Sequence, residues 1–88
     1  MSQFQKLMMV LLSGRSDSNI TFFELTKLLA RVGFDSRIKG SHHIFTKSGV
    51  EEILNLQPRA ALAKPYQVKQ VRDVLIKYRL VSGGDSDE

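Results

Sequence analysis

The middle of the chain contains three short extended segments separated by two turns that include glycine. Residues 35–39, 42–47 and 50–56 have the length of strands, and Gly40–Ser41 and Lys47–Gly49 separate them. Extended segments joined by such short glycine-containing turns are typical of antiparallel hairpins. The sequence therefore predicts a three-stranded antiparallel sheet, and the rest of the chain must supply the elements that cover it.

Two helices are expected before the sheet. Apolar residues recur at helical spacing in residues 2–13, with a serine as the N-cap and Ser13–Gly14 as the stop. The second helix begins at Thr21, which has the spacing of a capping box with Glu24, and it ends at Gly33. The capped second helix is the best-defined element that the sequence predicts.

One helix is expected after the sheet. Lys64–Pro65 opens it, because proline is favoured at the first helical position. Its apolar stripe consists of Val68, Val71, Val74, Leu75 and Tyr78. The order helix, helix, three strands, helix predicts an α+β domain of two layers, in which helices cover one face of a three-stranded antiparallel sheet.

A chain of 88 residues supports a single domain. We expect this domain to span residues 1–82, with residues 1–20 as an N-terminal extension of helix and linker, and residues 83–88 to form a disordered acidic tail. The absence of cysteine excludes a disulfide scaffold and a thiolate zinc site. The longest apolar run, Leu7–Leu12, is far shorter than the roughly 20 residues that cross a bilayer. A soluble, cytoplasmic protein without a membrane partner is therefore expected.

The charge of the chain is unevenly distributed. Thirteen Lys and Arg residues oppose nine Asp and Glu residues, which gives a net charge of +4. Three of the acids lie in residues 83–88, so residues 1–82 hold thirteen basic and six acidic side chains and carry a net charge of +7. A basic body of this kind favours a polyanionic partner, with nucleic acid as the first candidate.

The stretch Gly40–Phe45 holds both histidines of the chain. On a strand, His42 and His43 point to opposite faces and cannot bind one metal ion, so neither a metal site nor a cofactor is predicted. Ser41 beside His42 does not indicate a hydrolase, because the strand–turn–helix elbow of such a serine is absent. General acid–base catalysis by one imidazole remains, since an unperturbed histidine exchanges its proton near neutral pH.

RNA is a substrate on which a single base can act. Its 2′-hydroxyl lies beside a phosphate, so a base can start cleavage without a metal while cations stabilise the developing charge. Lys39 and Lys47 bracket the histidines, and Gly40 and Ser41 form the turn that would meet a phosphate. For these turn residues, a simple strand-end turn is an equally good explanation. Three further candidate cations lie at or near the start of the last helix, where a solvated helix face explains them equally well: Lys64, Lys69 and Arg72.

Residues 21–80 resemble the HicA (YcfA-like) toxins in a helix that ends at Gly33–Phe34, the run Lys39–Phe45, and the helix opened by Lys64–Pro65. The resemblance implies a fold like the double-stranded RNA-binding domain (dsRBD), α-β-β-β-α, and the activity of a small mRNA interferase. It also implies the toxin role in a type II toxin–antitoxin system and a HicB-type antitoxin that covers the active histidine. The family's catalytic histidine follows a Gly-Ser pair, which implies His42 and leaves His43 a supporting role.

Two other functions are compatible with the residues. A non-catalytic RNA-binding module of dsRBD-like fold would bind RNA in a salt-dependent manner without cleaving it. A pure protein-interaction domain would not bind RNA at moderate salt. Residues 2–13 and the loop 57–64 lie outside the family pattern.

Overall fold

The computed structural model describes residues 2–80 and contains six elements in the predicted order. They are α1 (Gln3–Ser13), α2 (Phe22–Val32), β1 (Asp35–Lys39), β2 (His42–Lys47), β3 (Val50–Leu56) and α3 (Pro65–Lys77). The three strands begin and end at the residues that the turn pattern predicts. The expected acidic tail, residues 83–88, lies outside the described residues.

The strands form one antiparallel sheet in the order β1-β2-β3, as predicted. Lys39 pairs with His42 across the first turn, and Lys47 pairs with Val50 across the second. An irregularity between Phe45 and Lys47 shifts the register of β2 against β3. Because consecutive strands pair directly through short turns, the sheet is a meander whose two edges are β1 and β3.

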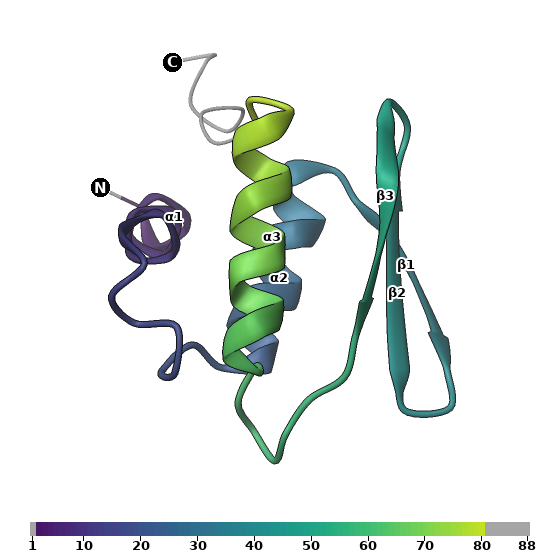
Figure 1. The fold of residues 1–88 in the computed structure, drawn as a ribbon, viewed down its shortest axis with the longest axis horizontal. Helices are drawn as coiled ribbons and strands as arrows, with labels where there is room; N and C mark the ends of the chain where they lie inside the picture. Colours follow the sequence, from purple (N-terminus) through teal and green to yellow (C-terminus); the bar gives the residue numbers. More distant parts are fainter. Residues whose placement is uncertain (1, 81–88) are drawn as a thin grey trace.

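Helices α2 and α3 lie side by side against one face of the sheet, and α1 packs on the side of these helices that faces away from it (Figure 1). The α2-sheet-α3 unit is the predicted two-layer α+β arrangement, and α1 adds a third layer of helix. Phe45, Leu54 and Leu56 turn toward the helices and are buried. The apolar residues of β3 therefore settle which face of the sheet is covered.

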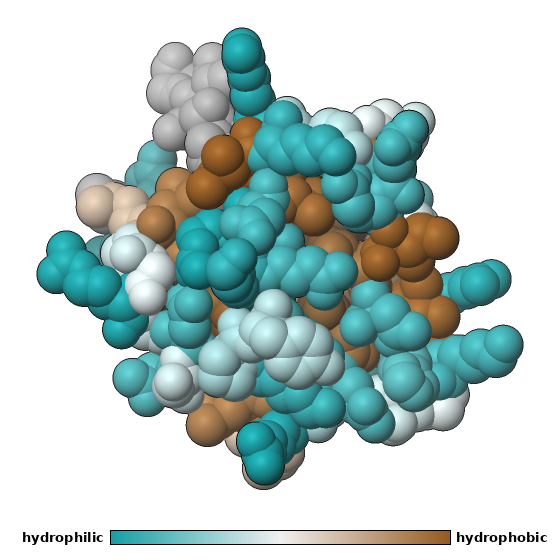
Figure 2. Space-filling view, viewed as in Figure 1, coloured by the Kyte–Doolittle hydropathy of each residue, from teal (hydrophilic) through white to brown (hydrophobic). Residues whose placement is uncertain are grey.

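The core lies between the three layers. Every helix contributes fully buried side chains to it, and the largest apolar ones are Leu11, Leu25, Leu28, Leu29, Val68, Val71 and Leu75. Burying a side chain of this size stabilises the fold by roughly 1.5–3 kcal/mol. Figure 2 shows that the surface over α3 is mostly hydrophilic, with apolar residues exposed only in small groups. Within residues 2–80, no helix combines the length and the apolar character needed to cross a membrane.

The helix ends follow the expected local chemistry. Thr21 and Glu24 form the capping box of α2, with both of its side-chain-to-backbone hydrogen bonds in place. Ser2 caps α1 in the same way, with Gln5 as the reciprocal partner. Gly33 ends α2 at a φ of 113°, a left-handed conformation that glycine adopts at little cost.

The segment before α2 is fastened to the segment before α3. The Ala63 amide donates to the Ile20 carbonyl at 3.0 Å, and the Phe22 amide donates to the Ala61 carbonyl at 3.0 Å. These backbone bonds hold the first turns of α2 and α3 at the same end of the molecule. The β1–β2 turn lies at this end as well (Figure 1), so three segments that are distant in sequence meet there.

Candidate active site

The turn between β1 and β2 presents the candidate residues of the central stretch. Gly40 has a φ of 64°, and Ser41 does not share this left-handed conformation, as a two-residue type II′ hairpin turn requires. A Cβ at Gly40 would have no neighbour within 4 Å, so backbone conformation alone demands glycine here. Lys39 and His42 flank the turn as a cross-strand pair and share one face of the sheet.

The two histidines point to opposite faces of the sheet, as the strand periodicity predicts. His43 shares its face with the buried Phe45 and is half-buried, and its ring packs edge-on against Phe22 with 4.8 Å between ring centroids. His42 is exposed on the face that no helix covers, and its Nδ1 lies 2.9 Å from Oδ1 of Asn55 on β3. Only His42 can therefore meet a substrate that approaches the open face of the sheet.

A chain of amide contacts connects the β1–β2 turn to α3. Nε2 of Gln57 donates to the Ser41 hydroxyl at 2.9 Å. The buried side-chain amide of Gln67 lies in the first turn of α3, 3.1 Å from both the Gln57 carbonyl and the Gln57 amide. When it is oriented with its nitrogen toward the carbonyl and its oxygen toward the N–H, it donates to the first and accepts from the second. The sequence did not indicate Gln57 or Gln67. Together Gln57 and Gln67 hold the segment after β3 between the β1–β2 turn and the start of α3.

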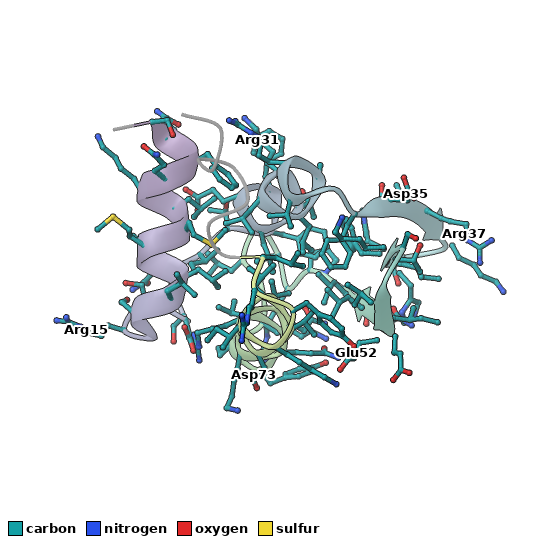
Figure 3. All side chains as sticks on the ribbon, turned by 90° about the horizontal axis from the view of Figure 1, so that it is seen from above. Arg15, Arg31, Asp35, Arg37, Glu52 and Asp73 are labelled. Carbon is teal, nitrogen blue, oxygen red and sulfur yellow. The ribbon has the colours of Figure 1, made fainter. Side chains whose placement is uncertain are left out.

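Lys39 is the predicted cation that the structure places beside His42. Arg37 precedes Lys39 by two residues on β1 and lies on the same exposed face, opposite Ile44 of β2. Within residues 2–80, neither Lys39 nor Arg37 takes part in an ion pair. Figure 3 shows Arg37 projecting from the sheet, on the side away from the helices. These two cations give the His42 face a positive border.

Lys47 does not join this group, although the sequence suggested that it brackets the histidines. It lies at the other end of β2, and five residue steps along the strand place it about 17 Å from His42. Its ammonium group sits over the end of α2, 2.9 Å from the position that a Cβ at Gly33 would occupy. There the positive charge faces the negative end of the helix dipole, which accounts for its place in the fold.

Arg72 is also separate from the candidate site, because its guanidinium turns toward α1. It donates to both carboxylate oxygens of Asp17, at 2.9 and 3.2 Å, and to the Leu11 carbonyl at 3.1 Å. The hydrogen bonds to Asp17 raise the pKa of Arg72 above its usual value. This side chain is only 14% exposed and fastens α1 and its linker to α3. The pairing removes Arg72 from the cations that can meet a phosphate.

The two remaining lysine candidates lie on α3. Lys64 is the N-cap of the helix and is half-buried, close in sequence to the Gln57–Gln67 contact. Lys69 lies one turn further along and forms an exposed i,i+4 ion pair with Asp73 at 3.2 Å. The structure thus brings Lys64 to the same end as the β1–β2 turn, while Lys69 points from the helix surface to solvent.

A polar cluster at the other end of the molecule joins β3 to the end of α3. Glu52 accepts from Lys77 at 2.8 Å and from the Tyr78 hydroxyl at 2.7 Å. The hydrogen bond from Lys77, followed by that from Tyr78, lowers the pKa of Glu52 to about 2, and the same contact raises the pKa of Lys77. These residues tie the sheet to the helix and are structural.

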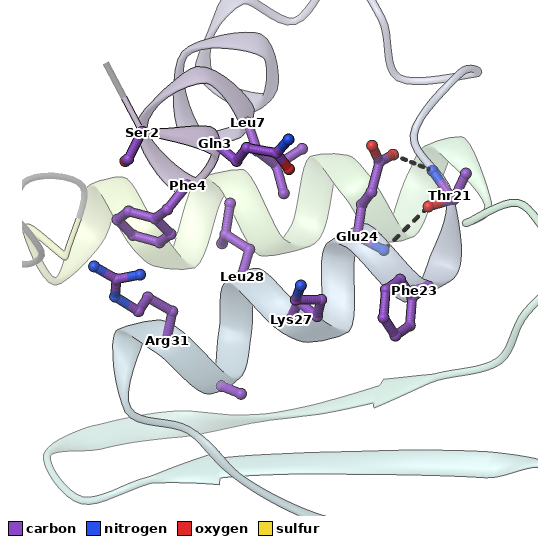
Figure 4. Close-up of a pocket in the computed structure, with 11 residues that line it drawn as sticks. Ser2, Gln3, Phe4, Leu7, Thr21, Phe23, Glu24, Lys27, Leu28 and Arg31 are labelled. Carbon is purple, nitrogen blue, oxygen red and sulfur yellow. Dashed lines mark hydrogen bonds between the residues drawn. The ribbon is translucent and has the colours of Figure 1, made fainter.

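A groove between two of the helices also lies away from His42. It has a volume of about 890 Å³ and runs between α1 and α2 (Figure 4). Phe4, Leu7, Phe23 and Leu28 line it, and the Arg31 guanidinium lies 4.7 Å from the centre of the Phe4 ring. The groove shares no residue with the candidate site.

Among residues 2–80, no three histidine, aspartate or glutamate side chains come close enough together to hold a metal ion. The His42 face presents an imidazole, the Asn55 amide and the cationic side chains of Lys39 and Arg37. In comparisons with known proteins, no family model, no curated protein and no solved structure matches the chain.

Proposed function

We propose that this protein is an endoribonuclease that cleaves mRNA without a metal ion, with His42 as the catalytic residue. The observation that carries the proposal is the contrast between the two histidines. The His43 ring is half-buried against Phe22, whereas the His42 ring is exposed on the open face of the sheet beside Lys39. An accessible imidazole next to a positive charge is the minimum that RNA cleavage by this route needs.

The proposed reaction uses the hydroxyl that RNA carries beside each phosphate. His42 accepts the proton of the 2′-hydroxyl, and the 2′-oxygen then attacks the adjacent phosphorus. The bond from phosphorus to the 5′-oxygen breaks, and that oxygen takes up a proton as it leaves. The products are a 2′,3′-cyclic phosphate and a 5′-hydroxyl. Lys39 stabilises the negative charge that develops on the phosphate.

We further propose that the unit α2-β1-β2-β3-α3 is a dsRBD-like fold and that the protein is a toxin of the HicA type. Two observations support this: the order of elements with both helices on one face of the sheet, and the run Lys39–Phe45 at the first turn. On this proposal the partner is a HicB-type antitoxin that covers His42, and both proteins act in the cytoplasm. α1 is an addition to that unit.

The proposed RNA contacts follow from where the structure places each candidate. Lys39, Gly40 and Ser41 lie in or beside the turn next to His42, and they are the main candidates for phosphate contact. Lys64 and Lys69 add charge at the start of α3, where the helix dipole also favours an anion. Lys47 and Arg72 are left out, since Lys47 covers the end of α2 and Arg72 holds Asp17.

The test is to express the wild type and His42→Ala under an inducible promoter and to follow growth and RNA integrity. We expect the wild type to arrest growth and cleave mRNA, and His42→Ala to lose both, with a drop in rate of roughly 100-fold or more. His43→Phe is the matched control, because phenylalanine keeps the packing against Phe22, and it should still cleave. Toxicity retained by a folded His42→Ala would refute the assignment.

Purified protein distinguishes the proposal from its alternative. Cleavage should continue in EDTA, and a 2′-deoxy nucleotide at the cleaved position should block it because the attacking oxygen is missing. A protein that binds RNA with a strong salt dependence but releases no product would instead be a non-catalytic RNA-binding module. In that case His42→Ala would change affinity only modestly.

A further inference from the structure

The contact between His42 and Asn55 determines which ring nitrogen of His42 carries the proton. Nδ1 of His42 lies 2.9 Å from Oδ1 of Asn55, and an amide oxygen can only accept a hydrogen bond. Nδ1 must therefore carry the proton in this contact, since two acceptors would repel each other. In the neutral ring the other nitrogen, Nε2, is then unprotonated and able to accept a proton.

We infer that Asn55 is a positioning residue that holds His42 in its Nδ1–H tautomer, so that Nε2 is the atom that removes the proton from the RNA 2′-hydroxyl. This assignment rests on the proposed function for its chemical meaning, while the tautomer itself can be observed without any RNA. The histidine side chain in water favours the Nε2–H form, so the contact with Asn55 acts against the ring's own preference. Without Asn55, Nε2 would hold the proton and could not act as the base.

The position of Asn55 in the sheet fixes the geometry of its contact with His42. Asn55 is opposite Ile44 on the neighbouring strand. Ile44 is two residues from His42 on β2, so Asn55 and His42 are diagonal neighbours on the same face of the sheet. Both strands are held in place by packing, because Phe45 on β2 and Leu54 on β3 are buried against the helices. The amide therefore approaches His42 from a fixed direction, as a group that orients a catalytic base must.

The amide of Asn55 also suits both stages of the reaction. When His42 has taken up the proton, Nδ1–H still donates to the same neutral oxygen, so the contact persists through the proton transfer. Lys39, the cross-strand partner of His42, is the charged residue facing the ring from β1, and Asn55 brings no charge from β3.

The direct experiment is to identify the tautomer by NMR, using long-range proton–nitrogen correlations of the ¹⁵N-labelled full chain. Spectra are recorded at about pH 8.5, where an ordinary histidine is neutral. We expect His42 to show the Nδ1–H pattern in the wild type and the Nε2–H pattern in Asn55→Ala. Asn55→Asp keeps an oxygen in place and should restore the Nδ1–H pattern. Ile53→Ala, on the same strand and the same open face, is the control that should leave His42 unchanged.

RNA cleavage by the same variants completes the test. We expect Asn55→Ala to lower the cleavage rate on the order of tenfold to a hundredfold while it remains folded, and Asn55→Asp to recover most of the loss. A wild-type His42 in the Nε2–H form would overturn the inference, as would an Asn55→Ala variant that keeps either the Nδ1–H form or full cleavage. If the tautomers behave as expected but no protein cleaves RNA, the proposed nuclease fails and the orienting role of Asn55 stands.

Discussion

Arg72 offers the most quantitative test of how α1 is held to the domain. Its guanidinium makes two hydrogen bonds to Asp17 and one to the Leu11 carbonyl at the end of α1. The two side chains are 14% and 21% exposed, so water screens the pair much less than a surface ion pair. We propose a double-mutant cycle of Arg72→Met, Asp17→Asn and the combined variant, in which methionine keeps the apolar stem and removes the donors.

The expected magnitudes follow from the number of bonds and from burial. Arg72→Met loses three hydrogen bonds and leaves a shielded carboxylate unpaired, which should cost about 2–3 kcal/mol of the unfolding free energy. Asp17→Asn keeps one acceptor and should cost about 1–2 kcal/mol. The coupling between the two positions should be about 1–2 kcal/mol, since the pair is close and largely shielded. In a domain of this size a loss of 2 kcal/mol lowers Tm by about 8–16 °C.

Urea unfolding followed by circular dichroism measures all four proteins of the cycle. Additivity of the two single changes within about 0.5 kcal/mol would show that the pair does not act as a unit and would refute the reasoning. RNA cleavage at a temperature where every variant is folded provides the second readout. Arg72→Met should cleave like the wild type with an unchanged salt dependence, whereas loss of a phosphate contact would reduce the salt slope by about one.

Two further predictions concern the sheet end that is remote from His42. The depressed pKa of Glu52, about 2, means that its tie to Lys77 and Tyr78 contributes stability above the ordinary glutamate pKa of 4.5 and loses it as pH falls toward 2. Glu52→Gln should therefore unfold at lower urea than the wild type at pH 7, and the two proteins should converge near pH 2; a constant difference would contradict this. Gly33→Ala should cost about 1–2 kcal/mol, because φ is 113° there and a Cβ would meet the Lys47 ammonium. An unchanged thermal midpoint would contradict the strain at Gly33.

Local chemistry allowed the elements of the fold to be predicted. The capping box at Thr21 and the glycine at position 33 determine where α2 begins and ends, and both act within a few residues of themselves. The turn at Gly40 needs only a left-handed residue between two extended segments. Signals of this kind involve only residues that are close together in the sequence. This explains why the predicted strand limits are confirmed to the residue.

The places of Lys47 and Arg72 could not be predicted in this way. Lys47 is close in sequence to His42, but the two ends of an extended strand lie far apart. Arg72 is close in sequence to Lys69, but successive residues of a helix point in different directions and so meet different neighbours. Lys47 faces α2 because β2 runs from the first turn to the far end of the sheet. Arg72 faces α1 because that helix packs beside α3, a contact that depends on the tertiary arrangement of the whole chain.

Asn55 is an intermediate case, since the sequence contains part of the signal. A regular two-residue turn between β2 and β3 would place Asn55 directly opposite His42, whereas the irregularity after Phe45 places it opposite Ile44 instead. A register shift of two residues keeps every side chain on its original face. The common face of Asn55 and His42 was therefore predictable from the turn, while the contact between their side chains required the observed register.

The division of the sheet into two faces explains how so small a domain can carry the proposed active site with little loss of folding stability. All of the buried side chains of β2 and β3 point toward the helices, so stability depends on that face. Lys39, His42 and Asn55 point the other way and are exposed, so none of them has to be desolvated or paired within the core. Substitutions at these three positions should consequently separate function from folding, in contrast to Arg72. This separation is what allows the proposed roles of His42 and Asn55 to be tested in folded protein.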